Sequence, residues 1–142
     1  PGILGLLGVT LTQDGAEAIA GLLEKGGIEY LTLESCKIDP DDVLDIVNGL
    51  SDNRSLKGLD LSSSGVRAEA AYRLLDVLKG GGGAALENID LSFNELPDGA
   101  KIGLLEFGMQ RDGLSIETCD ADYEDKDGEV VDSEDDEVAE EY

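Results

Sequence analysis

The chain contains 142 residues, enough for one domain of ordinary size. Its 10 Lys and Arg against 33 Asp and Glu give a formal net charge of −23, so nucleic acids and anionic membranes would repel it. The expected partner is therefore a protein with a basic surface. The chain has no His, the commonest general base and metal ligand, which argues against an enzyme, a metal and a cofactor.

Compartment is indicated by the apolar residues and the cysteines. No apolar stretch is long enough to span a bilayer, and Cys36 and Cys119 are too few for a disulfide framework. These features predict a soluble protein of a reducing, intracellular compartment. The cytoplasm, the nucleus and the interior of an organelle all remain open.

One apolar pattern recurs along the chain. Copies begin near residues 1, 28, 56, 86 and 114, at intervals of 27 to 30 residues, and the first copy is degenerate. The clearest copy reads L-E-N-I-D-L-S-F-N-E-L, in the spacing L-x-x-L-x-L-x-x-N-x-L, with its pattern residues at Leu86, Ile89, Leu91, Asn94 and Leu96. Alternating residues predict a short strand in each copy. Asn94 and the corresponding Cys36 are expected at the turn that follows, Asn94 bonded to the backbone and Cys36 buried.

The first copy lacks polar residues on the open face of its strand. Ile3 and Leu7 stand there with two glycines, Gly5 and Gly8. Contiguous exposed apolar surface is uncommon, and repeat arrays need polar ends. We expect this edge to be covered, either by a partner or by residues that precede Pro1.

A helical pattern follows each of the first four predicted strands. The apolar face recurs at i, i+1 and i+4, as Ile19, Ala20 and Leu23, then Ile46, Val47 and Leu50, then Leu74, Leu75 and Leu78. In the fourth copy, Leu104, Leu105 and Phe107 are expected to supply it. Asp39-Pro40 and Leu96-Pro97 predict helix starts. The result is an α/β fold: a short right-handed β-α solenoid with parallel strands on the concave face and helices outside.

Glycines close these helices at Gly26-Gly27 and at Gly80–Gly83. The second group follows a helix and leads into a strand. A phosphate-binding loop has the opposite order, so the glycines predict a connector.

Side chains on the open strand face are the predicted partner-binding set. They are Tyr30, Thr32, Glu34, Asp60, Ser62, Asn88, Asp90, Ser92 and Phe93, with Ser115 and Glu117 as a continuation. Stacking should place Thr32, Asp60 and Asp90 in one column and Glu34, Ser62 and Ser92 in another. The concave face is the usual binding surface of such arrays. A polar face that only keeps the sheet soluble is the alternative.

Asp60 and Asp90 on neighbouring strands could in principle form an acid–base pair. Asp60 lies, however, in L-D-L-S and Asp90 in I-D-L-S, which are ordinary residues for this repeat pattern, and the chain has no His that could activate the neighbouring serines as nucleophiles. We therefore expect no catalytic residues.

Residues 120–142 form a predicted acidic tail, separate from a domain over residues 1–119. The tail has 13 acidic residues and one Lys, which is typical of a solvated segment. Its predicted partner-binding residues are Asp132, Glu134, Asp135, Asp136 and Glu137. An EF-hand alignment from Tyr123 to Glu134 fails because Tyr123 cannot supply the first ligand, so no metal site is expected.

The copies of about 28 residues, each with a full helix, resemble ribonuclease-inhibitor-type leucine-rich repeats. The resemblance covers residues 1 to about 119 and implies protein binding. An array followed by an acidic tail is also similar to Ran GTPase-activating proteins. Arg54, Arg67, Arg73 and Arg111 lie in helix or loop contexts, however, and the GTPase-acting residues of that family match no position here.

Three functions follow as hypotheses. The first is a non-catalytic interaction module, or a small subunit of a hetero-complex, that binds through the concave face, the apolar amino-terminal edge and the tail. The second is a regulator of a small GTPase, as the layout of the Ran GTPase-activating proteins implies. The third is a chaperone of a basic protein such as histone, acting through the tail.

Overall fold

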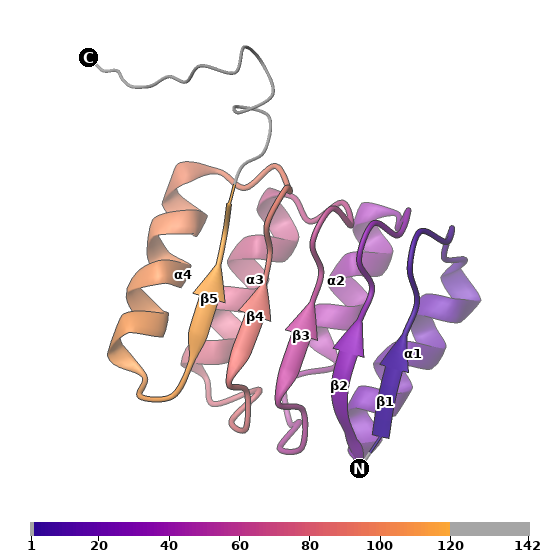
Figure 1. Cartoon of the computed structure of the whole chain (residues 1–142), viewed down its shortest axis with the longest axis horizontal. Coiled ribbons are helices and arrows are strands. Elements are labelled where there is room, and N and C mark those ends of the chain that lie inside the picture. The colour runs from indigo at the N-terminus through magenta and orange to yellow at the C-terminus, as the bar shows by residue number, and fades with distance from the viewer. Residues whose placement is uncertain (1, 120–142) are drawn as a thin grey trace.

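The computed structural model describes residues 2–119, in which five strands and four helices alternate along the chain (Figure 1). The strands are β1 (Gly2–Gly5), β2 (Ile28–Thr32), β3 (Gly58–Asp60), β4 (Asn88–Asp90) and β5 (Ser115–Glu117). The helices are α1 (Gln13–Lys25), α2 (Pro40–Asn48), α3 (Ala68–Lys79) and α4 (Asp98–Gln110). The predicted α/β class is confirmed.

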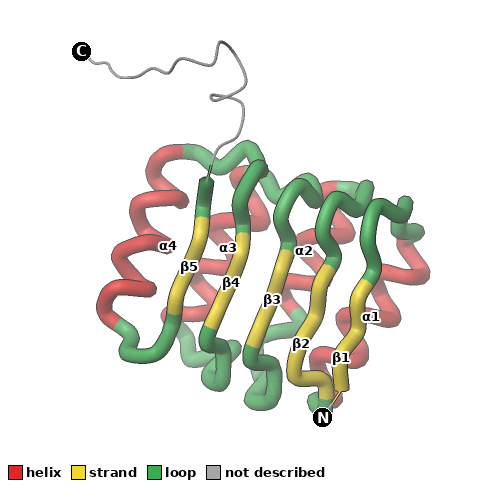
Figure 2. The backbone as a smooth tube through the Cα atoms, in the orientation of Figure 1, coloured by secondary structure: helices red, strands yellow, loops and turns green. Residues whose placement is uncertain are grey.

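All five strands form one parallel sheet, in the order of the chain. Figure 2 shows them side by side in yellow, with the four red helices together behind the sheet. The register aligns Thr32 with Asp60 and Asp60 with Asp90, as the pattern predicted. We call the sheet surface turned away from the helices the strand face.

The last strand continues the strand face through Ser115 and Glu117 as predicted, but the repeat copy that contains it starts one residue earlier than the apolar pattern predicts. Ser115 lies opposite Asn88 and Ile116 opposite Ile89, so a copy counted from Leu86 would restart at residue 113 and not at Leu114. Leu114 is buried although it occupies the position of the polar Glu87. Because Leu114 is apolar at a position that is polar in the preceding copy, the sequence pattern placed the start of this copy one residue too late.

The core lies between the sheet and the helices. Alternate strand residues point into it, and the pairs Leu31 and Leu33, Leu59 and Leu61, and Ile89 and Leu91 are all buried. The predicted apolar face of α3 is buried as well, and so is that of α2 together with Leu50, which follows the helix. In α1, Ile19 and Leu23 are buried, while Ala20 is half-buried. In α4, Leu104 is buried, Phe107 packs against the core and Leu105 is half-buried.

Helix ends follow their sequence signals. Asp39 precedes α2 with Pro40 as the first helical residue, and Pro97 precedes α4. The Thr12 hydroxyl caps α1 by accepting a hydrogen bond of 3.0 Å from the Gly15 N–H. Gly26 and Gly80 end α1 and α3.

The turn after each of the strands β2, β3 and β4 is tied to the preceding strand–helix unit by one side chain. The Cys36 thiol donates to the Leu6 carbonyl oxygen, and the Ser64 hydroxyl donates to that of Leu33. Asn94 Nδ2 donates to the Leu61 carbonyl oxygen over 2.8 Å. These turns would otherwise leave backbone acceptors unpaired in the interior. The predicted turn roles of Asn94 and buried Cys36 are confirmed.

In the loops that lead from a helix to the next strand, other side chains also bond backbone groups of neighbouring units. Asn53 is buried, donates to the Leu23 carbonyl oxygen at 2.7 Å and accepts from the Leu56 N–H at 2.8 Å. The Arg111 guanidinium donates to the Gly83 carbonyl oxygen at 2.8 Å.

None of the described helices is long and apolar enough to cross a membrane.

Candidate binding surface

The strand face carries the predicted column of Thr32, Asp60 and Asp90, and Glu117 extends it. Asp60, Asp90 and Glu117 lie in register on β3, β4 and β5, beside Thr32 of β2. Glu34 is exposed just beyond β2. The surface is therefore predominantly anionic, which suits a basic partner.

The carboxylates of Asp60 and Asp90 also shape the chain. Asp60 Oδ1 accepts hydrogen bonds from the Ser62 N–H at 2.9 Å and from the Ser62 hydroxyl at 2.6 Å. Asp90 Oδ1 accepts from the Ser92 N–H at 3.0 Å. One oxygen of each carboxylate thus closes the turn that follows the strand, while both side chains stay half-exposed.

Ser62 and Ser92 are in the predicted column, but both are buried. The Ser62 hydroxyl is engaged by Asp60, and the Ser92 hydroxyl accepts a hydrogen bond of 3.1 Å from the Cys119 N–H. Their hydroxyl groups therefore serve the fold. Sequence spacing places a side chain on a face but does not reveal how deeply its neighbours cover it.

A hollow of about 270 Å³ lies on this face around Gly58. A Cβ atom at position 58 would lie 2.8 Å from Cδ1 of Tyr30, so the absence of a side chain lets the Tyr30 ring lie over β3. Thr32, Asp60 and Asn88 also line the hollow, so the structure brings together four of the predicted residues.

Two lining residues of the hollow, Lys57 and Glu87, were missed by the sequence analysis. They stand one position before the face residues Gly58 and Asn88. The one sequence signal for them was Gly58, because a residue without a side chain leaves space on the face that its neighbours can line.

Phe93 has an unusual backbone. Its φ is 61°, in the left-handed region, while its ring is 49% exposed. The same position is Gly8, Ser35 and Ser63 in the earlier units, with φ of 68°, 58° and 51°. The turn therefore imposes this conformation, and glycine or serine adopts it with less crowding than an aromatic residue.

At the β1 edge of the sheet, Ile3 and Leu7 are largely exposed. Ile3 belongs to the same face as Tyr30, because the two lie opposite each other in the register. Leu7 continues this face, because the N–H groups of its neighbours Leu6 and Gly8 still donate to the β2 side of the sheet. The predicted apolar edge is thus present within the described residues.

The other predicted sites are of two kinds. The tail residues Asp132, Glu134, Asp135, Asp136 and Glu137 lie outside the described residues. Within residues 2–119, no group of three or more His, Cys, Asp or Glu could hold a metal ion.

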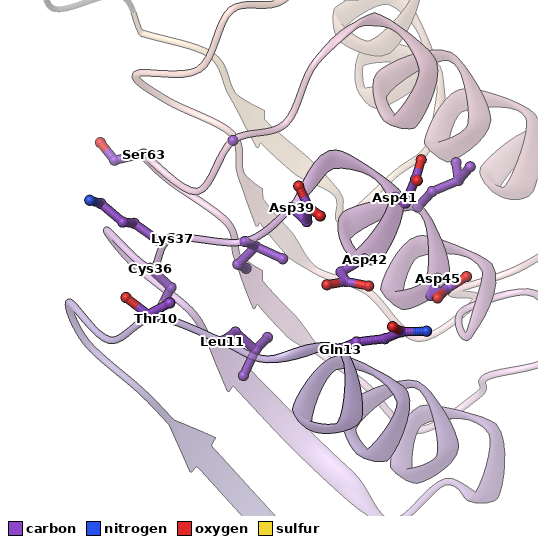
Figure 3. A pocket seen from close by; sticks show the side chains of 13 residues that line it. Thr10, Leu11, Gln13, Cys36, Lys37, Asp39, Asp41, Asp42, Asp45 and Ser63 are labelled. Carbon is purple, nitrogen blue, oxygen red and sulfur yellow. The ribbon is translucent and has the colours of Figure 1, made fainter.

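A second concavity was not predicted at all. It is a groove of about 880 Å³ where the turns after β1, β2 and β3 meet the first turns of α1 and α2 (Figure 3). Four aspartates line it, and one of them, Asp42, is buried. The run Asp39-Pro40-Asp41-Asp42 was interpreted only as a helix start.

Comparison of the sequence with protein-family models and with curated proteins finds no match.

Proposed function

We propose that this protein is a non-catalytic interaction module that binds a basic protein through its strand face, as one subunit of an intracellular hetero-complex. In this proposal the fold is a short leucine-rich-repeat solenoid of the ribonuclease-inhibitor-like class. The sheet order and the side chains that tie each turn to the preceding unit support it.

The observation that carries the proposal is Phe93. A left-handed backbone costs a bulky residue about 1–3 kcal/mol, and a half-exposed ring recovers little of this by burial. Serine stands at the equivalent positions 35 and 63, so the fold itself does not require an aromatic residue there. Covering the ring by a partner would offset the strain.

Charge supports the choice of partner. Carboxylates form the central column of the strand face, and an exposed glutamate lies beyond β2. A basic surface would be steered toward this face and held in register by it. The aromatic rings of Tyr30 and Phe93 would supply the apolar anchors that interfaces favour.

The β1 edge extends the same surface. Ile3 and Leu7 are exposed apolar residues on this face, and an interface that includes them would remove them from water. The acidic tail is proposed as an additional contact for the basic partner.

The test uses immobilised wild-type protein and two variants, Phe93→Ser and Met109→Ser, to capture proteins from a native extract. Met109 is 84% exposed but belongs to α4, behind the sheet, so it is the matched control. We expect wild type and Met109→Ser to retain the same basic protein, and Phe93→Ser to retain about tenfold less or lower. Quantitative mass spectrometry of the retained fraction measures this.

Equal retention by the two variants would contradict the strand-face proposal. Serine at position 93 is expected to fold, because serine already adopts this conformation twice in the chain. Circular dichroism of both variants checks this.

A further inference from the structure

The groove at the helix starts has two chemically different parts. One part is apolar and is lined by Leu11, Ile38 and Leu44. The other part is acidic and is lined by the aspartates at positions 39, 41, 42 and 45. Figure 3 shows the carboxylates of Asp39, Asp42 and Asp45 around one end, with Lys37 pointing away from them at the other end. A ligand here would need an apolar part and a cationic part.

The helix dipole accounts for some of these carboxylates. Asp39 precedes α2, and Asp41 lies in its first turn, where negative charge is stabilised by the free N–H groups. Both are exposed to water. By themselves they would be an ordinary helix start.

Asp42 differs because it is only 8% exposed. Within residues 2–119, no hydrogen-bond donor reaches its carboxylate, whereas Asp60 and Asp90 each accept hydrogen bonds. A buried carboxylate without a partner is costly. Loss of water raises the pKa of Asp42, and the carboxylates of Asp39, Asp45, Asp41 and Glu17 raise it further.

A bare metal ion does not fit this site. The described residues contain no group of three or more acidic or sulfur ligands with metal-binding geometry, and the groove is far larger than an ion. An organic cation on an aliphatic stem matches both parts of the groove.

We propose that this groove binds the side chain of an arginine presented by a protein partner, with the guanidinium donating to the Asp42 carboxylate and the stem packing against Leu11, Ile38 and Leu44. Arginine suits a desolvated carboxylate better than lysine, because its guanidinium is weakly hydrated and donates two parallel hydrogen bonds. The inference rests on the proposed binding of a basic protein but assigns a second surface, at the ends of the strands.

The test uses a peptide probe, acetyl-Gly-Arg-Gly-amide, titrated into the full chain labelled with ¹⁵N and followed by NMR. We expect saturable amide shifts confined to the turns and helix starts that line the groove. The same peptide with citrulline in place of arginine is isosteric but uncharged, and it should produce no saturable shifts.

Asp42→Asn should weaken binding of the arginine peptide about tenfold or more, because a charge-assisted hydrogen bond is lost. Asp52→Asn is the matched control, since Asp52 is exposed in the loop after α2 and its loss changes the net charge equally. It should leave the affinity within about twofold. Equal weakening by both variants, or shifts spread over all surface carboxylates, would overturn the proposal.

Two further arms separate the alternatives. The first arm titrates spermidine in place of the peptide. If spermidine binds in a way that depends on Asp42 and the arginine peptide does not bind, the groove is a polyamine site and the arginine proposal is overturned. Phe93→Ser should leave binding of the arginine peptide unchanged, because Phe93 does not line the groove. If the arginine peptide does not bind but capture of the partner depends on Phe93, only the groove proposal is rejected. If the peptide binds with the expected dependence on Asp42 but capture does not depend on Phe93, only the strand-face proposal is rejected.

Discussion

Asn94 shows how much one side chain can contribute to the stacking of two strand–helix units. Its amide oxygen accepts from the N–H groups of Ser64 and Val66, and its Nδ2 donates to the carbonyl oxygens of Leu61 and Leu91. Alanine at this position would leave these backbone groups without partners in a poorly hydrated turn. We expect Asn94→Ala to lower the free energy of unfolding by about 2–4 kcal/mol.

Urea denaturation measures this loss. Asn88→Ala is the control, because Asn88 lies on the strand face and makes one long contact of 3.5 Å to Glu117. Its effect should stay within about 0.5 kcal/mol. Similar losses in both variants would show that the turn hydrogen bonds are unimportant.

Asp42 makes the pH dependence of stability predictable in sign. Its carboxyl pKa is raised in the folded state, by loss of water and then by the carboxylates of Asp39, Asp45, Asp41 and Glu17. Between the ordinary and the raised pKa the folded state binds more protons, so the free energy of unfolding falls as the pH rises through this window. Above this window Asp42 is charged in both states, and its lowering of the free energy of unfolding has reached its full value.

Asp42→Asn should therefore raise the thermal midpoint at pH 7, and the gain should shrink as the pH is lowered through that window. The Asp52→Asn variant should show little difference from wild type at either pH. Thermal unfolding of the three proteins at pH 7 and near pH 4 compares them. A gain that grows toward low pH would contradict the assigned direction of the pKa shift.

At the scale of elements, α4 has two dissimilar faces two residues apart. Leu104 is fully buried against the sheet and α3, whereas Ile102 is 55% exposed. Leu104→Ala should cost about 2–5 kcal/mol, because it leaves a cavity in the core. Ile102→Ala should change the free energy of unfolding by no more than about 0.5 kcal/mol.

Denaturant unfolding of the two variants measures the difference directly. Equal losses would mean that α4 packs with another face than the one described. The comparison also tests the helix on which the sequence pattern was weakest, because Leu105 belonged to the predicted face and is only half-buried.

At the scale of the whole molecule, the net charge of −23 opposes compaction through self-repulsion. Residues 120–142 carry 13 acidic residues and one Lys, whereas the apolar cluster extends from Ala16 to Leu114. We expect a chain that ends at Cys119 to keep its circular dichroism spectrum. Its thermal midpoint should rise slightly at low salt and match the full chain at about 0.5 M salt, where charges are screened.

A truncated chain that fails to fold would refute the predicted boundary between domain and tail. Loss of partner binding by this same truncated chain, with Phe93→Ser unaffected, would move the binding function from the strand face to the tail.

Most of the fold could be predicted because it is encoded by local spacing. Apolar residues two apart make a strand face and those four apart make a helix face, so these assignments need no knowledge of distant neighbours. Ile89, Leu74 and Val47 all lie where the pattern predicted. Asn94 was predictable for a similar reason, since a turn after a strand has backbone groups to satisfy. The candidate surface was predicted less completely, because Ser62 and Ser92 are buried and do not contribute to it.

The sequence by itself determined the alternation of strands and helices, most residues of the core and the acidic character of the molecule. Only the tertiary structure decided which polar residues are buried. Asp42 looks like any first-turn aspartate until α1 and the turns of the neighbouring units close around it. Burial depends on atoms that are far apart in the chain, whereas periodicity depends on residues that are adjacent in it, and for that reason the groove emerged only from the fold.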